Sequence, residues 1–309
     1  MTPFFDIPKK TTLTALLLGT VVFAAQAQRT PSPSPAAQVK QTVGVTDLTV
    51  TYSRPMLRGR KAFGPDSTSV RKFGEVWRTG ANGATVFELS TDAVVEGQML
   101  PAGKYSLLSI PDPSAWTVIF NKNASASEQT YSQGDDALRV KVTPMMNGPK
   151  TDAFLVWFSN LTDSTATMNL AWDTALVPVK LAFNTSANTE KNIAEAVAAK
   201  PDDANVLASA ANYNLSKGKN LNQALEWVNK SIGIKETFRN VWTKAQILAK
   251  LGNFTEAVPL AQKALALGQG DSVFPFFKGG IESSLKEWQT KLPSLDAVKG
   301  KVMGKKKKS

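Results

Sequence analysis

Hydrophobic and polar residues alternate along the first half of the chain, in short runs that extend from residue 43 to residue 183. Leu48, Val50 and Tyr52 form one such run. A period of two places the apolar side chains on one face of a half-buried β-strand. Turn-forming sequences separate the runs and no amphipathic helical stretch interrupts them, so about eight or nine strands are expected without crossover helices. Residues 41–184 are therefore predicted to form an antiparallel β-sandwich or barrel.

Pro178 lies inside the last of these alternating runs. Proline has no backbone N–H to donate to a neighbouring strand, so it is found on edge strands or at irregularities. The run that contains Pro178 is therefore predicted to be an edge strand.

Beyond residue 187 the apolar period becomes helical, and one segment of the sequence repeats. Residues 220–225 (NLNQAL) match residues 253–258 (NFTEAV), and Gly218 aligns with Gly252 at an offset of 34 residues. Small residues occur where paired helices approach, and glycine occurs where the first helix ends. This pattern resembles the tetratricopeptide repeat, so the sequence predicts a multidomain protein with an α-helical module over residues 188–292. The resemblance implies about two and a half repeats plus a closing helix, and such a short array is expected to pack on the β-rich region.

The first residues have the organisation of a secretory signal. Lys9 and Lys10 precede an apolar stretch that ends in Ala-Gln-Ala at residues 25–27, a small-x-small cleavage pattern. An uncleaved anchor is the alternative, but threonines dilute the stretch below the ~20 apolar residues that a span requires. Residues 1–27 are predicted to be a signal peptide, and the mature protein is expected in the periplasm or outside the cell.

Two segments of biased composition flank the expected folded regions. The proline-rich residues 28–40 are predicted to be a disordered linker, and residues 293–309 a disordered basic tail. Of the formal net charge of +11, four positive charges are the lysines at 305–308, and the others are scattered. A basic tail on an exported protein contacts acidic surfaces more often than DNA, so no nucleic-acid partner is expected.

The chain contains no His and no Cys. Serine and cysteine nucleophiles activated by histidine are therefore excluded, as are disulfides and histidine-ligated zinc sites. Any catalysis would depend on carboxylates, Lys, Tyr or Arg, or on a metal with oxygen ligands. We expect no cofactor and no metal site, and the sequence identifies no catalytic residue.

The densest polar cluster of the β-rich region gives a hypothesis for a ligand site. Guanidinium groups bind carboxylate, phosphate or sulfate in a bidentate manner, so a small anionic ligand is one interpretation. The alternative is that the arginines fix loops to Glu75, Asp66 or backbone carbonyls. Tryptophans also permit carbohydrate binding; Trp77 is the candidate for a surface contact, whereas Trp116, Trp157 and Trp172 are expected in the core. The candidate ligand-binding residues are Arg54, Arg58, Arg60, Glu75, Trp77, Arg78 and Asn82.

Part of this cluster carries a family resemblance. The sequence WRTGAN at residues 77–82, with PAGKYS at 101–106 and WTVIFN at 116–121, resembles the domain of unknown function 2911 family. The resemblance extends over about residues 38–183. It implies a domain boundary but no activity.

Two functions from different classes follow from these observations. The first is an exported, non-catalytic binding or scaffolding protein, in which the helical repeats contact a protein partner and the β-rich region binds a ligand or docks to the cell envelope. The second is a histidine-free hydrolase or carbohydrate-active enzyme that uses Glu75, Asp135 or Asp136 with the arginines. Asp135 and Asp136 also fit a polar turn or a calcium site. The candidate contacts for a protein partner are Asn212, Asn214, Lys244 and Gln246.

Overall fold

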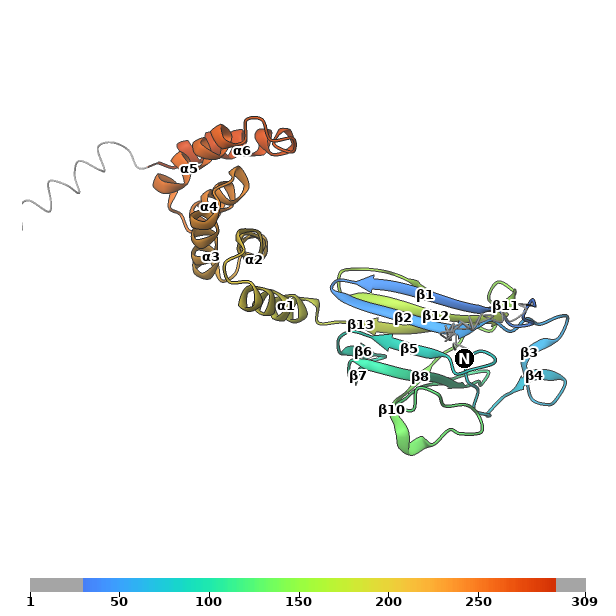
Figure 1. Cartoon of the computed structure of the whole chain (residues 1–309). Coiled ribbons are helices and arrows are strands. Elements are labelled where there is room, and N and C mark those ends of the chain that lie inside the picture. Colours follow the sequence, from blue (N-terminus) through green and yellow to red (C-terminus); the bar gives the residue numbers. More distant parts are fainter. Residues whose placement is uncertain (1–29, 293–309) are drawn as a thin grey trace, which may run out of the picture.

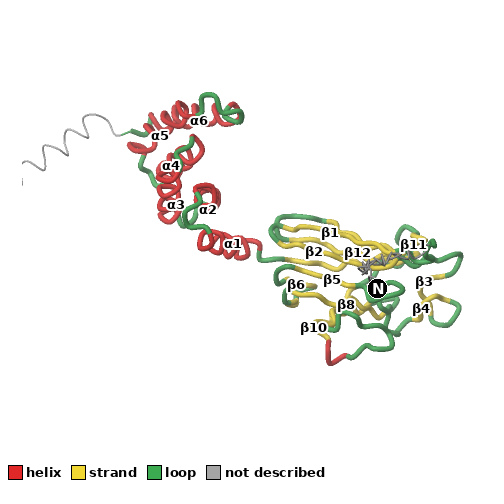
Figure 2. The backbone as a smooth tube through the Cα atoms, viewed as in Figure 1, coloured by secondary structure: helices red, strands yellow, loops and turns green. Residues whose placement is uncertain are grey.

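The computed structural model describes residues 30–292 and contains a β-rich region followed by six helices (Figure 1). The tube in Figure 2 shows that strands and helices are separated along the chain, with the strands before residue 183 and the α-helices after it. The predicted signal peptide, the first residues of the predicted linker and the predicted basic tail lie outside the described residues. The antiparallel β-rich region and the helical region were both predicted.

The first sheet has six antiparallel strands in the order β1-β2-β5-β8-β9-β10. The pairs β1–β2, β8–β9 and β9–β10 are consecutive along the chain, whereas β3 and β4 lie between β2 and β5, and β6 and β7 lie between β5 and β8. The strands of this sheet are β1 Ala36–Val43, β2 Thr46–Ser53, β5 Val86–Leu89, β8 Gly103–Ile110, β9 Trp116–Asn121 and β10 Asp136–Val142.

The second sheet has five antiparallel strands in the order β11-β12-β13-β6-β7. A separate parallel pair, β3 Lys61–Gly64 and β4 Ser69–Lys72, lies outside both sheets. The strands of the second sheet are β6 Ala93–Val95, β7 Gln98–Leu100, β11 Thr151–Ser159, β12 Thr165–Asp173 and β13 Ala175–Ala182.

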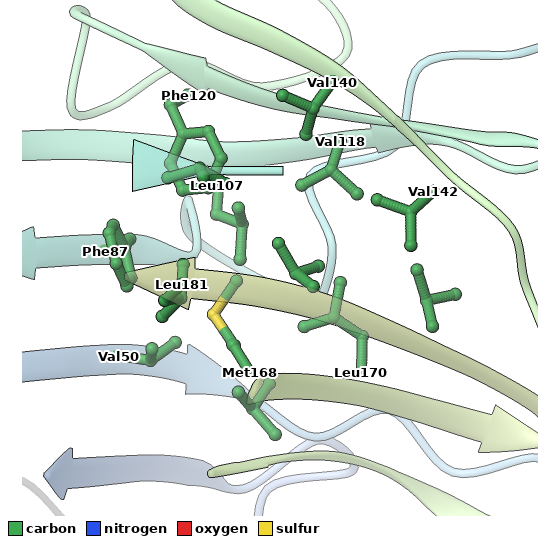
Figure 3. Close-up of a cluster of buried hydrophobic side chains, with 14 of the residues drawn as sticks. Val50, Phe87, Leu107, Val118, Phe120, Val140, Val142, Met168, Leu170 and Leu181 are labelled. Carbon is green, nitrogen blue, oxygen red and sulfur yellow. The ribbon is translucent and has the colours of Figure 1, made fainter. Parts of the chain in front are cut away.

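The two sheets share one hydrophobic core. Figure 3 shows Phe87, Val118 and Phe120 of the first sheet near Met168 and Leu181 of the second. These five side chains are at most 2% exposed. Their strands are the ones that the alternating pattern predicted, because burying one face of each sheet is what makes a period of two favourable.

Strand β1 begins at Ala36, inside the segment 28–40 for which the sequence predicted a disordered linker. The strand pairs with β2 along its whole length, from Ala36↔Ser53 to Val43↔Thr46. The hairpin turn between them contains Gly44, whose φ is +59°. A Cβ on Gly44 would lie 2.4 Å from the carbonyl oxygen of Asp163, so glycine is required there. Backbone pairing with β2 therefore gives regular structure to a segment whose proline-rich composition predicted disorder.

Pro178 is not on an edge strand as predicted, since β13 lies between β12 and β6. The proline is accommodated because β13 is not paired continuously on the side that faces β6. On the side facing β6, Leu176 exchanges backbone hydrogen bonds with Met145, and Lys180 donates its N–H to the Glu96 side chain. Pro178 stands between these two positions, where strand alternation directs its nitrogen to the same side. The absent N–H therefore interrupts no ladder.

The helical region consists of α1 Thr185–Ala199, α2 Ala204–Lys217, α3 Leu221–Ile234, α4 Phe238–Lys250, α5 Phe254–Leu267 and α6 Pro275–Gln289. Helices α2 and α4 begin 34 residues apart, the offset of the sequence repeat. Each is followed by a glycine of positive φ, +65° at Gly218 and +82° at Gly252. Asp203 caps α2, as its side chain accepts hydrogen bonds from the N–H groups of Asn205 and Val206.

The helices do not pack on the sheets as expected. Figure 1 shows α2–α6 leading away from the β-rich region, with α1 between. Hydrogen bonds at the junction include those from Thr185 to the Asp163 carbonyl (2.6 Å) and from Asn188 to Thr91 (3.1 Å), both at the start of α1. Helix α6 provides the missing neighbour instead, because its Ile281 and Trp288 complete the apolar cluster of α4 and α5. Within residues 30–292, no helix is both long enough and apolar enough to cross a membrane.

Candidate functional site

Two of the predicted ligand-binding arginines, Arg54 and Arg60, donate hydrogen bonds to backbone carbonyls, and a third, Arg58, lies in an exposed turn. The Nε of Arg54 donates to the Phe154 carbonyl (2.9 Å), and the Nε of Arg60 donates to the Leu57 carbonyl (3.0 Å). Arg58 is exposed and adopts a φ of +50°, which is a turn conformation. The alternative interpretation, in which arginines bind backbone carbonyls, fits Arg54 and Arg60.

Arg78 belongs to an ion-pair network centred on Glu128. Its Nε donates to the Glu128 carboxylate (2.6 Å), its backbone N–H donates to the same group (3.2 Å), and Arg71 approaches within 3.1 Å. The Glu128 side chain is 14% exposed. Burial disfavours its ionised form, but the hydrogen bonds from Arg78 and the charge of Arg71 outweigh burial and lower the pKa of Glu128. Burial lowers the pKa of Arg71, against the effect of Glu128.

The carboxylate that pairs with Arg78 is therefore not Glu75 or Asp66, the partners considered from the sequence. Glu75 is 63% exposed and its nearest cation is Lys72, at 3.6 Å. Glu128 is separated from Arg78 by fifty residues, and no local pattern relates the two. Glu128 lies in the loop that follows β9, and the pairing of β9 with β8 brings this loop close to Arg78.

Trp77 is buried, at 1% exposure, so the prediction of a surface aromatic is wrong. Its ring stacks on Trp172, with centroids 5.5 Å apart, and its Nε1 donates to the Gly80 carbonyl (2.9 Å). The cause is a bridge with Ser109, in which the two backbones exchange hydrogen bonds of 2.8 Å. This bridge holds the segment against β8 and turns the indole inward. Trp157, expected in the core, is only half-buried.

Asn82 forms a turn, with a φ of +61°, and its side-chain amide donates to the Ser34 carbonyl (3.1 Å). Its own carbonyl accepts a hydrogen bond from Arg78. Together with the network around Glu128, these contacts fix the loop that carries the WRTGAN sequence.

Asp135 and Asp136 do not form a carboxylate pair across an open site. Asp136 accepts hydrogen bonds from Asn121 (2.8 Å) and Tyr131 (2.7 Å) and pairs with Arg139 (2.9 Å). Burial and the neighbouring Asp136 raise the pKa of Tyr131 to about 12. Asp135 ends a short 3-10 helix before β10. Among residues 30–292, no three acidic side chains are grouped in a way that would hold a metal ion.

The helical region contains an open groove between α2, α4 and α6, with a volume of about 750 Å³. On α2 and α4 the lining residues recur at the spacing i, i+3, i+4, i+7, which is one face of a helix. The two helices thus present equivalent faces to the groove. The residues on these faces are Asn205, Ala208, Ser209 and Asn212 of α2 and Arg239, Trp242, Thr243 and Gln246 of α4.

Two of the four predicted partner contacts, Asn212 and Gln246, line this groove. Lys244 does not line it, and Asn214 is buried at 4% exposure, with its side-chain nitrogen lacking a hydrogen-bond partner among the described residues. Residues two apart on a helix are separated by about 200° around the axis, so Asn212 and Asn214 cannot share a face. The same reason separates Lys244 from Gln246.

The remaining lining residues give the groove its charge and its apolar floor. Arg239 lies over the rings of Phe238 and Phe277, with centroids 5.8 and 5.6 Å away. Lys235 and Asp271 also line the groove, at its rim. The sequence interpretation missed Arg239, Lys235, Asp271 and Phe277. The spacing of Arg239, Trp242 and Gln246 along α4 was the available signal.

The molecule thus combines an antiparallel β-sandwich with a helical array that has a lined groove. Residues 34–181 match the family described as "Protein of unknown function (DUF2911)". The match confirms the resemblance over the β-rich region and ends within β13, before the helices. No curated protein matches the chain.

Proposed function

We propose that this chain is an exported, non-catalytic binding protein whose helices form tetratricopeptide-like repeats and hold a segment of a partner protein in the groove. One observation carries the proposal: α2 and α4, which occupy equivalent positions in the repeat, present the same helical face to one concavity. Stacked helix pairs expose such concave surfaces for protein recognition. Asn212 and Gln246 are the partner contacts that the proposal keeps from the sequence.

The proposal gives the β-rich region a docking role at the cell envelope. Its candidate arginines are already bonded to other groups of the region: Arg54 and Arg60 to backbone carbonyls, and Arg78 to Glu128. A small-ligand role would require these contacts to be broken, at a cost of ~1–3 kcal/mol for each hydrogen bond of a charged group. The region therefore serves as a rigid base that leaves the groove accessible.

Export is part of the proposal and rests on the signal-like sequence of residues 1–27. Expression of the whole chain in a Gram-negative host, followed by N-terminal sequencing of the periplasmic fraction, tests it. A mature N-terminus at Gln28 is expected. A chain that keeps Met1 and stays in the cytoplasm would contradict export.

The groove is tested by selecting peptides from a display library on the mature chain and repeating the selection on an Ala208→Trp variant. The new indole projects from the groove-lining face of α2, so enriched peptides are expected to lose binding. Asn229→Trp is the matched control, since Asn229 is exposed on α3 and does not line the groove. If Ala208→Trp and Asn229→Trp bind the enriched peptides equally well, the groove is not the binding site.

The hydrolase hypothesis gains no support from the geometry. Glu75 is exposed beside Lys72, and Asp136 is held by Asn121, Tyr131 and Arg139. Glycoside hydrolysis needs two carboxylates facing one bond. Glu75 lies in a loop and Asp136 at the start of β10, and the two have separate partners.

A further inference from the structure

The groove contains two cations whose charge is not neutralised. Arg239 on α4 and Lys235 just before it both line the groove and are exposed. Neither takes part in an ion pair among residues 30–292, unlike Lys263 on α5, which pairs with Glu236 next to Lys235. A fixed, unpaired positive charge inside a concave surface attracts anionic groups.

Arg239 is also held in place before any partner arrives. Its guanidinium lies over Phe238, which is 3% exposed, and over Phe277 of α6. Stacking on two rings restricts the side chain, so less rotamer entropy is lost when it binds a carboxylate in a bidentate manner. Lys235 has no such support and acts as a flexible point charge.

Apolar and amide groups lie next to these cations. Trp242 lines the groove and stacks on Trp288, with centroids 5.4 Å apart, which fixes its position. Asn212 and Gln246 provide amide groups that can bind the backbone of an extended chain. A cationic side, an aromatic floor and amides together fit a peptide in which acidic and apolar residues alternate.

We infer that the occupant of the groove is an extended peptide segment of a partner protein whose Asp or Glu side chains pair with Arg239 and Lys235 and whose apolar side chains contact Trp242 and Phe277. The inference rests on the proposed function and specifies its partner chemistry.

Asp271 also lines the groove, and its charge is opposite to those of Arg239 and Lys235. Removing the charge of Asp271 should therefore change binding in the opposite direction from removing a cation. One of its carboxylate oxygens accepts the backbone N–H of Val273 at 3.0 Å. Asparagine can keep that hydrogen bond while removing the charge. Asp271→Asn is therefore expected to improve binding of an acidic segment, whereas loss of a cation weakens it.

The experiment measures binding by fluorescence anisotropy, with the mature chain and a short labelled peptide in which Asp and Glu alternate with Leu and Phe. The peptide is amidated at its C-terminus so that only side-chain carboxylates are present. Loss of a charge-assisted contact is expected to weaken binding about tenfold in Arg239→Glu, and severalfold in Lys235→Glu. Asp271→Asn is expected to bind the peptide about twofold more tightly, since it removes a negative charge that repels the acidic side chains of the peptide.

Lys244→Glu is the matched control, because Lys244 lies on the same helix as Arg239 but outside the groove. It changes the net charge by the same amount and is expected to leave binding unchanged. Far-ultraviolet circular dichroism and melting curves establish that each variant is folded. Equal losses of affinity in Lys244→Glu and Arg239→Glu would overturn the inference. The peptide would then respond to the net charge of the chain, which includes the lysines at 305–308, and not to the groove.

A peptide in which Asn and Gln replace the acids separates this inference from the proposed function. If that peptide binds as tightly as the acidic one and Ala208→Trp abolishes both, the acidic chemistry is wrong and the groove function stands. If neither peptide is affected by Ala208→Trp, both proposals fail. Absence of any binding by the acidic peptide also overturns the inference.

Discussion

The β-rich region and the helical region use their polar side chains in different ways. In the β-rich region, Arg54 donates to a buried backbone carbonyl and Arg78 pairs with Glu128, so both arginines stabilise loops. In the helical region, Arg239 lines a groove without an ion pair among the described residues. The same residue type therefore has a structural role in one region and is available to a partner in the other.

This difference follows from how each region buries its apolar surface. The two sheets enclose one large cluster, and the loops at their ends must satisfy many backbone groups without help from a ladder. The helices satisfy their own backbones and bury smaller clusters between pairs. Polar side chains on the groove-lining faces of α2 and α4, such as Asn212 and Gln246, are consequently not needed to satisfy the backbone. Three experiments test this comparison.

The largest effect is expected from Trp77→Ala. Removing a fully buried indole from the aromatic cluster should lower the free energy of unfolding of the β-rich region by about 3–5 kcal/mol. Urea unfolding is followed by near-ultraviolet circular dichroism, to which tryptophans of both regions contribute, and by circular dichroism at 222 nm, which reports the helices. Part of the near-ultraviolet transition is expected to shift to lower urea concentration, with little change at 222 nm. Phe276→Ala is the control, because Phe276 is 87% exposed. Equal effects in Trp77→Ala and Phe276→Ala would contradict the buried position of Trp77.

A smaller effect is expected from Glu128→Gln, which leaves Arg71 and Arg78 without their carboxylate. The expected loss of stability is about 2 kcal/mol at neutral pH, a value between those of exposed and fully buried pairs. The folded-state pKa of Glu128 is lowered below its ordinary value of 4.5. Its contribution is therefore complete above pH 4.5 and is lost as the pH falls through the lower, folded-state pKa.

The pH dependence of the stability difference between the wild type and Glu128→Gln tests whether the charge of Glu128 stabilises the loop. Urea titrations of the wild type and Glu128→Gln are expected to diverge at pH 7 and to converge below pH 4.5. Glu75→Gln is the matched control, because Glu75 is exposed and forms its ion pair with Lys72 rather than with Arg71 or Arg78; it should show no such convergence. A constant difference between wild type and Glu128→Gln across this range would show that the charge of Glu128 is not what stabilises the loop.

The smallest effects on stability are expected from replacing one arginine in each region by alanine. Arg54→Ala is expected to cost about 1 kcal/mol, because the Phe154 carbonyl loses its donor. Arg239→Ala is expected to cost about 0.5 kcal/mol, because the guanidinium of the exposed Arg239 loses its stacking on Phe238 and Phe277. Chemical unfolding measures both. A larger cost for Arg239→Ala than for Arg54→Ala would mean that Arg239 has a structural role, and would weaken the comparison of the two regions.

Much of the fold could be predicted because its signals are local. Every second residue of the runs at Leu48–Tyr52 and Val177–Phe183 is buried, as the period of two requires. The glycines after α2 and α4 have the positive φ that ends a helix. The short strands β6 and β7 were not identified, since three residues are too few to establish a period.

The order of the two regions, the inward faces of the main strands and the absence of histidine chemistry could all be derived from the residues alone. Which polar residues are available depends on how distant segments come together in the folded chain. Glu128 reaches Arg78 from fifty residues away, Trp77 turns inward through its bridge with Ser109, and Arg239 remains in an open groove. Periodicity reports which side of an element faces the core, but the partner of a side chain depends on contacts between distant segments, and these exist only after the chain has folded.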